Sequence, residues 1–163
     1  MRKLLFCVFI AAISALVPGS ASAAQPVITH YTQDVGPFVI TDVCSAAIMV
    51  SGHLVVSETD YFDANGSPSR LYLHTVETDT FTGPGRALTS DPYTYGTWFT
   101  FDADGNIVSG NIAGVIVRVR LPNGSLFLSA GRVVLHPNGP VFTFSPDFGR
   151  SGDLSALCGA LGA

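Results

Sequence analysis

Two pairs of carboxylates with the same spacing are the residues of this sequence that most suggest chemistry. Glu58 and Asp60 lie on one predicted strand, and Glu77 and Asp79 lie on the next. If these strands pair, four carboxyl groups gather near one rim of a sheet, and two carboxyl groups about 5–10 Å apart are what a glycosidase requires. Acidic residues near strand ends are normally solvated, so we predict no catalytic residue from this pattern.

Three arginines form a second candidate group. Arg118 and Arg120 alternate with apolar residues on one predicted strand, and Arg132 lies on its partner strand. If the three side chains converge inside the mouth of a barrel, they would bind a carboxylate or another anion. The simpler interpretation, which we favour, is that they cover the solvent face of the sheet.

The sequence does not indicate a metal site. No two histidines are separated as in His-x-His or His-x-x-x-His, so there is no local zinc ligand set, although distant strands could bring His53 and His74 together. The Asp-Ala-Asp-Gly-Asn segment at 102–106 begins like a calcium loop, but Ala113 stands where the bidentate Glu is needed. We predict a hairpin turn there, and no metal or cofactor.

The motifs of the common catalytic classes are also missing from the sequence. There is no Gly-x-Ser-x-Gly nucleophile elbow and no glycine-rich phosphate loop. The only lysine is Lys3, which lies in the predicted export signal, so the exported chain cannot use a lysine Schiff base. These absences favour a protein that is not an enzyme.

The first 23 residues are typical of a secretory signal. Arg2 and Lys3 precede an apolar run at 4–17, and Ala21, Ser22 and Ala23 fit the small-residue cleavage pattern. The apolar run is shorter than the roughly 20 residues of a membrane-spanning helix. We therefore predict a signal peptide at 1–23 with cleavage after Ala23, and a secreted single β domain at 24–163.

The charge of the chain limits its partners. The net charge is −4, and cleavage of the signal would remove two more cations. Nucleic acids and anionic membranes both attract dense cationic surfaces. We therefore expect neither nucleic acid nor, after cleavage, a membrane as a partner.

Two cysteines remain after the predicted cleavage, Cys44 and Cys158. In an oxidising compartment two thiols are typical of one disulfide. The alternatives are two free thiols or a metal site, but there is no Cys-x-x-Cys or nearby histidine spacing to support a metal. A disulfide that closes so long a loop is worth about 4–5 kcal/mol in the chain-entropy account.

Short apolar runs separated by Gly, Pro, Asn and Asp turns predict an all-β fold, an antiparallel barrel or sandwich of about seven to nine strands with a short C-terminal helix. The clearest signal is a hairpin over 112–135, in which two β-branched runs flank the turn at Pro122, Asn123 and Gly124. The predicted strands cover 27–32, 38–40, 46–59, 70–82, 87–90, 93–101, 106–121, 125–135 and 141–144.

Only the end of the chain has a helical pattern. Apolar residues recur at i, i+3, i+4 and i+7 from Leu154, and Ser151 or Asp153 can cap the helix at 153–161. A helix this short is marginal by itself. A bond from Cys158 to Cys44 would hold its apolar side over one end of the sheet.

Several short motifs follow one another in a set order: an early cysteine, a Phe-Asp-x-x-Gly turn, a Pro-x-Gly turn followed by Ala-Gly-Arg, and a closing Leu-Cys-x-Ala-Leu. They occur at Cys44, 62–66, 122–124, 130–132 and 157–161. Over about residues 42–161 the chain thus resembles a family of small secreted bacterial all-β proteins that has no established activity. It departs from that pattern at 45–47, where Ser-Ala-Ala replaces an aromatic-Pro segment. The resemblance implies no catalytic residues.

Aromatic residues on alternating strands, without a catalytic set, favour a secreted non-enzymatic protein that binds a small apolar ligand inside a β-barrel. One alternative is a barrel-interior isomerase or cyclase of the allene oxide cyclase type, which rests on analogy of fold. Another is a surface module that binds a partner and has a filled core. The sequence leaves the ligand and the oligomeric state open. The residues that we expect to contact a ligand are Tyr72, His74, Trp98, Arg118 and Arg132.

Overall fold

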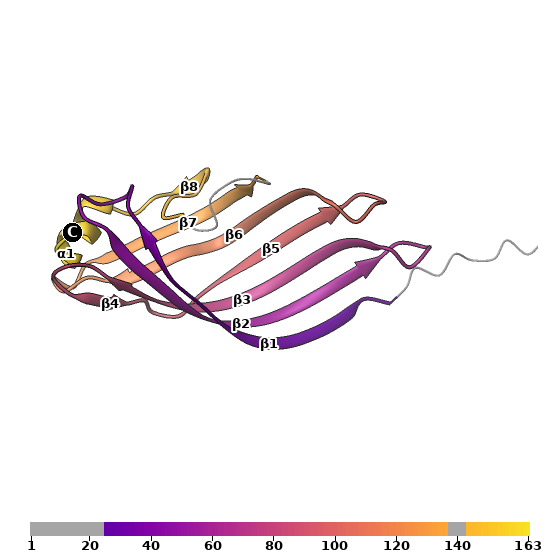
Figure 1. Ribbon diagram of the computed structural model, residues 1–163, viewed down its shortest axis with the longest axis horizontal. Helices are drawn as coiled ribbons and strands as arrows, with labels where there is room; N and C mark the ends of the chain where they lie inside the picture. The colour runs from indigo at the N-terminus through magenta and orange to yellow at the C-terminus, as the bar shows by residue number, and fades with distance from the viewer. Residues whose placement is uncertain (1–24, 137–142) are drawn as a thin grey trace, which may run out of the picture.

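A computed structural model describes residues 25–136 and 143–163 as one antiparallel β-sheet with a short C-terminal helix (Figure 1). The predicted fold class is confirmed. The predicted signal peptide and residues 141–142 lie outside the described residues, and Thr143 and Phe144 are not in a strand. The elements are β1 (Val27–Ile40), β2 (Ile48–Phe62), β3 (Pro68–Thr82), β4 (Ala87–Thr89), β5 (Tyr93–Phe101), β6 (Ile107–Arg120), β7 (Leu126–Leu135), β8 (Phe148–Arg150) and α1 (Leu154–Leu161).

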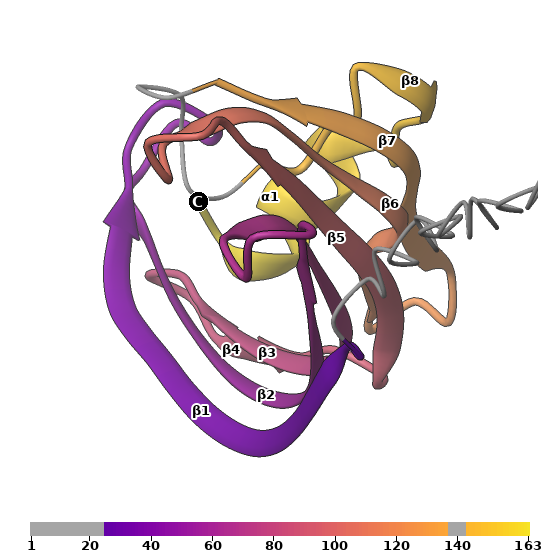
Figure 2. The ribbon, with the colours of Figure 1, turned by 90° about the vertical axis from the view of Figure 1, so that its right-hand side faces the viewer.

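The sheet is strongly curled, and its strands surround an interior (Figure 2). Neighbouring strands follow the order β1-β2-β3-β5-β6-β7-β8, and β4 pairs with β3. Among the described strands, β1 pairs only with β2, and β8 pairs only with β7. The sheet is therefore not closed into a barrel, and its opposite parts face each other as in a sandwich.

The predicted hairpin over 112–135 is present as β6 and β7. Its turn closes through the amide of Leu121, which donates to the carbonyl of Ser125 at 2.9 Å, and Gly124 adopts a φ of 83°. The pairing shifts register between Val115 and Val117, so Ile116 and Val117 are both buried although they are adjacent. This β-bulge bends the strand and strengthens the local curl.

Asparagine and aspartate side chains close the hairpin turns. The Asp102 carboxylate accepts from the amides of Asp104 at 3.0 Å and Asn106 at 2.8 Å, and these backbone hydrogen bonds lower its pKa. Asp63 makes the same kind of contact with the amides of Asn65 and Ser67. The calcium-like segment at 102–106 is thus a hairpin turn, as we predicted.

Two features of the strand prediction needed correction. β1 runs as one strand from Val27 to Ile40, because the Gly36-Pro37 step is accommodated by a shift in register between Val35 and Phe38. β8 was not predicted, because its three residues are exposed and carry no alternation of apolar and polar side chains.

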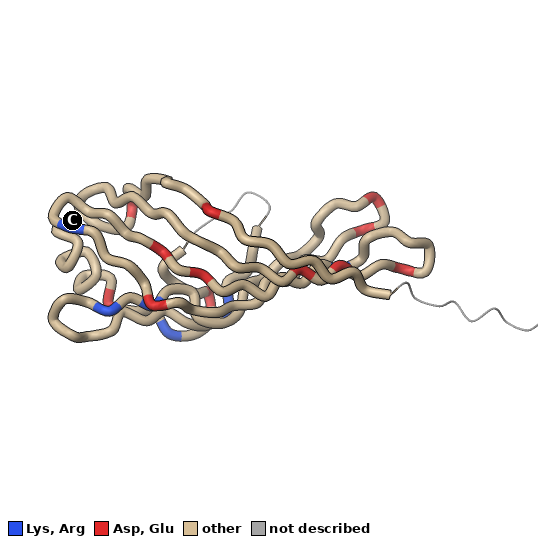
Figure 3. The backbone as a smooth tube through the Cα atoms, turned by 90° about the horizontal axis from the view of Figure 1, so that it is seen from below, with Lys and Arg blue, Asp and Glu red and all other residues tan. Residues whose placement is uncertain are grey.

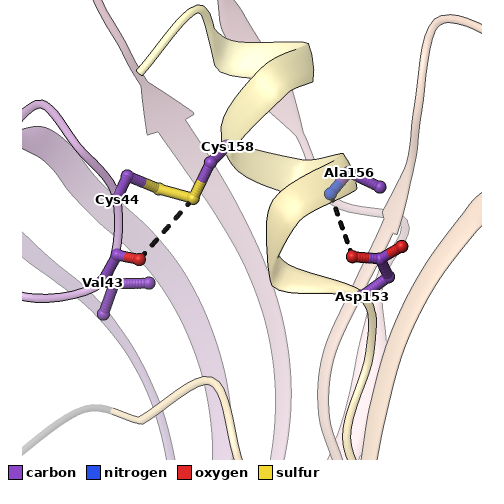
Figure 4. The surroundings of a disulfide bond; sticks show 5 residues. All are labelled: Val43, Cys44, Asp153, Ala156 and Cys158. Carbon is purple, nitrogen blue, oxygen red and sulfur yellow. Dashed lines mark hydrogen bonds between the residues drawn. A yellow bond between two sulfur atoms is a disulfide. The ribbon is translucent and has the colours of Figure 1, made fainter.

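The cluster of buried core residues includes Leu157 and Leu161 of α1, which lies at one end of the molecule (Figure 1). A disulfide joins Cys44 to Cys158 with the Cα atoms 5.5 Å apart, which confirms the predicted bridge (Figure 4). Asp153 caps α1 by accepting from the amide of Ala156 at 3.1 Å. The fully buried core residues include Ile48, Val50, Phe81, Val117, Val119, Phe127, Leu157 and Leu161.

Acidic residues occur along the whole length of the molecule, whereas the basic residues visible in Figure 3 lie toward the α1 end. In the described part of the chain, no helix is long and apolar enough to cross a membrane.

Candidate functional site

Two acidic side chains face the interior of the curled sheet. Glu77 and Asp79 follow Thr75 on the concave face of β3, and only 8% of Glu77 and 1% of Asp79 are exposed. The predicted cluster of four carboxyl groups is wrong. β2 and β3 are antiparallel, so Glu58 lies opposite Leu73, far along the strand from Asp79.

Two tyrosines of β5 bind these carboxyl groups. The hydroxyl of Tyr93 donates to Oδ2 of Asp79, and the hydroxyl of Tyr95 donates to Oε2 of Glu77 at 2.6 Å. Tyr93 is the direct cross-strand partner of Glu77, so each phenol reaches the carboxyl group diagonally across from it. Each carboxyl group is therefore held by a phenol from the neighbouring strand.

Gly52 of β2 provides the space in which the two carboxyl groups meet. It lies opposite Asp79, and a Cβ at this position would lie 2.6 Å from Oδ1 of Asp79 and 3.0 Å from Oε1 of Glu77. A glycine inside a strand often marks such a close approach. The missing side chain is what lets two acidic residues share one small site.

The site holds protons that free carboxyl groups would lose. Burial raises the pKa of Asp79 to about 7, and the negative charge of Glu77 adds to the shift, whereas the hydrogen bond from Tyr93 opposes it. Burial also raises the pKa of Tyr93 and of Tyr95. At pH 7 the carboxyl group of Asp79 therefore binds a proton in a substantial share of the molecules, whereas a free carboxyl group would be ionised. Both phenols are donors to the pair.

Glu77 of the carboxyl pair borders a cavity of about 200 Å³ inside the curl of the sheet, whereas Asp79 lies outside its lining. Most of the lining is aliphatic or aromatic, and the polar groups gather on the wall that β3 and β5 form. Such a site can bind an apolar molecule and exchange a hydrogen bond or a proton with it at one point. The lining residues are Val35, Phe38, Leu54, Glu77, Tyr93, Tyr95, Ile112, Ile116, Val133, Leu135 and Thr143.

The aromatic residues that we expected to contact a ligand lie elsewhere. Tyr72, His74 and Trp98 alternate with the inward-facing residues of β3 and β5, so they occupy the convex face. The rings of Tyr72 and Trp98 lie 5.0 Å apart between centroids, and His74 is exposed. None of the three lines the cavity. Alternation showed that these residues share a face, but not which face the curl encloses.

The arginines also lie on the outside. Arg118 and Arg120 both approach Oδ2 of Asp91, at 3.5 and 3.8 Å, and the guanidinium of Arg132 lies 4.8 Å from the ring centroid of Phe148. All three arginines are exposed, and none lines the cavity. This arrangement agrees with the solvent-face interpretation and not with an anion site inside the sheet.

The sheet does not bring His53 and His74 together. His53 lies opposite Thr78, whereas His74 lies opposite Ser57, and Nδ1 of His53 is 2.6 Å from Oδ1 of Asp34. Within residues 25–136 and 143–163, no three His, Cys, Asp or Glu side chains are grouped as a metal site would require.

Sequence reasoning missed Gly52, Tyr93 and Tyr95 as members of a site. A usable signal was present, because the alternation of β3 places Glu77 and Asp79 on the same face as Leu73 and Thr75. Continued by four residues, the pattern would have placed both carboxyl groups on one face of the sheet with Leu73 and Thr75, but the pattern does not show which face the curl encloses.

Comparison with known proteins found no match to this chain: no family model, no curated protein and no solved structure aligns with it significantly. The function must therefore be argued from the site itself.

Proposed function

We propose that this protein binds a small, largely apolar molecule in the cavity, with one hydrogen-bonding group of the ligand against Glu77 and Tyr95. The observation that carries the proposal is the lining of the cavity, which is mostly apolar apart from Thr143 and the wall of carboxyl and phenol groups. Ligand sites commonly combine an apolar surface with a few placed polar groups that orient the bound molecule.

The volume of the cavity limits the size of the ligand. An apolar cavity of about 150 Å³ holds benzene, so 200 Å³ accommodates a single ring or a short branched chain. The carboxyl group of Glu77 would accept a hydrogen bond from a hydroxyl or an amine of the ligand. The proposed ligand is therefore a compact alcohol or amine with an apolar body.

We further infer that the protein acts outside the cytoplasm. The Cys44–Cys158 disulfide supports this inference, because such bonds persist mainly in oxidising compartments. The sequence pattern of residues 1–23 agrees with it.

Benzyl alcohol, benzylamine and toluene are suitable probes of the cavity. We expect saturable binding, measured by calorimetry, in which both polar probes bind more tightly than toluene. Ile116→Phe fills the cavity and should abolish binding, whereas Val55→Phe, which adds the same side chain at an exposed position of β2, should not. Equal binding by both variants would contradict the proposal. Native mass spectrometry of protein from its own source would reveal a retained ligand.

The carboxyl pair favours a second candidate function, acid–base catalysis of an isomerisation or cyclisation. A carboxyl group with a pKa near 7, as Asp79 has, can both donate and accept a proton. Asp79 does not itself line the cavity, so its proton would reach a ligand through Glu77, which does. The molecule that native mass spectrometry finds bound to the protein, added back to the purified protein, distinguishes the two functions. Conversion of the added ligand to an isomer, detected by chromatography and lost in Asp79→Asn, would support the enzyme. Recovery of the ligand unchanged would support the binding protein.

A further inference from the structure

We propose that the convex face of the sheet binds the sugar rings of a neutral polysaccharide through the rings of Tyr72 and Trp98, which we call the aromatic platform. This face is opposite the cavity, so the proposal is independent of the ligand proposed above.

The platform is built by the register of β3 and β5. Tyr72 and Trp98 are direct cross-strand partners, with ring centroids 5.0 Å apart and planes inclined by 33°. Both rings lean over Gly96, where a Cβ would be 2.6 Å from Cη2 of Trp98 and 2.9 Å from Cε2 of Tyr72. The indole therefore lies along the sheet surface. Trp98 is 41% exposed, so part of its ring faces solvent.

Uncharged polar side chains lie on two sides of the platform, and Arg70 and His74 flank Tyr72 on the same face of β3. The cross-strand row places Thr59 beside Tyr72, and Asn111 beside Trp98. The next row toward the hairpin turns contains Thr100 and Ser109. These hydroxyl and amide groups offer both donors and acceptors around an aromatic centre.

A groove of about 350 Å³ runs beside the platform. Arg70 lies at this groove, with its guanidinium 5.1 Å from the ring centroid of Tyr61. A third aromatic ring therefore lies one row beyond the platform, on the same face and in the direction of the groove. The groove is lined by Tyr61, Arg70, Leu71, Tyr72, Trp98, Phe99 and Thr100.

The chemistry of this surface matches a sugar ring. A pyranose has an apolar C–H face, which stacks on an aromatic ring. It also has hydroxyl groups around its edge, which need hydrogen-bond donors and acceptors such as the hydroxyl and amide groups beside the platform. The platform has Arg70 as its one adjoining cation, so it lacks the cationic density that nucleic acid or anionic lipid requires. A protein partner typically covers about 800 Å² on each side, much more than two rings provide.

The fluorescence of the platform tests the proposal directly, because Trp98 is the only tryptophan of the chain. We expect titration with cellohexaose or chitohexaose to shift the emission to shorter wavelength in a saturable way. Anionic phosphatidylglycerol vesicles should leave the emission unchanged. A response to vesicles alone, or no response to either oligosaccharide, would overturn the proposal.

Sedimentation with insoluble cellulose or chitin extends the test to variants. Trp98→Ala and Tyr72→Ala should each weaken retention about tenfold, with the fold checked by circular dichroism. Phe148→Ala removes an exposed ring on β8 away from the platform and should retain full binding. Retention of Trp98→Ala at the level of the unmodified protein would show that the platform is not the binding surface.

Discussion

Glu77 and Asp79 are the side chains whose burial needs the most compensation. An ionised carboxyl group loses its hydration when it is buried, and the loss is large unless hydrogen bonds or protonation offset it. Here two phenols donate to the pair, and the raised pKa of Asp79 favours its protonated form below about pH 7. Buried carboxyl groups with a large desolvation cost and a shifted pKa are common at functional sites, so this pair is a candidate site.

Replacement of Asp79 by Asn should change how stability depends on pH. The pKa of this carboxyl rises from 3.8 to about 7 on folding, so between about pH 4 and pH 7 the folded chain binds more protons than the unfolded chain. The free energy of unfolding should therefore fall as pH rises through this window, and then level off. Asp79→Asn removes this contribution, which is on the order of 4 kcal/mol.

Urea unfolding between pH 4.5 and pH 8 measures the effect. Asp79→Asn should flatten the slope and make the protein relatively more stable at pH 8. Asp60→Asn, a change of the same kind at a half-buried position of β2, serves as the control and should retain the slope. An unaltered slope in Asp79→Asn would mean that the carboxyl is ionised throughout the folded protein.

Among the elements, α1 depends most on its surroundings. Eight residues are too few for a stable helix in water, so its persistence depends on contacts made elsewhere in the chain. Leu157 and Leu161 are fully buried against the core, and Cys158 is bonded to the segment between β1 and β2. The disulfide thus joins the last element to the loop that follows the first.

Removal of the bridge should loosen this end of the molecule. For the Cys44→Ala, Cys158→Ala double variant, we expect the free energy of unfolding to fall by up to about 4–5 kcal/mol, because the unfolded chain gains freedom. Hydrogen exchange should show that the amides of α1 lose protection before those of β3. If stability and exchange in α1 both stay the same, the bridge does not hold the helix.

As a whole, the molecule is one curled sheet that offers two surfaces of different chemistry. Its concave face holds a packed core beside α1 and a cavity with the carboxyl pair. Its convex face carries the aromatic platform and the exposed arginines. Because successive residues of a strand point to opposite faces, a side-chain substitution on one face should leave the other face largely unchanged.

The proposed export of the protein predicts a defined first residue for the mature chain. When the full sequence is expressed with a functional secretion system, the protein recovered outside the cytoplasm should begin at Ala24, as read by N-terminal sequencing. Ala23→Asp should block this cleavage, because the site requires a small residue. Recovery of the chain from the cytoplasm with Met1 in place and three free thiols after denaturation, those of Cys7, Cys44 and Cys158, would contradict export.

Local patterns were enough for much of the architecture. The turn at Pro122, Asn123 and Gly124 predicted its hairpin, and the alternation from Tyr93 to Phe101 matched β5 because strand preference and turn chemistry act over a few residues. The cap at Asp153 is equally local. The disulfide followed from counting, since the two cysteines outside the predicted signal peptide allow one intramolecular pairing.

The location of the site depended on long-range pairing. Alternation sorts the residues of a strand onto two faces, but both faces of β3 and β5 carry aromatic side chains, so only the direction of curl decided that Tyr93 and Tyr95 lie inside and Trp98 outside. Likewise, only the register of β2 against β3 placed Gly52 opposite Asp79 and left room for Glu77. Register and curl are set by the sum of contacts across the whole sheet, which no short stretch of sequence contains.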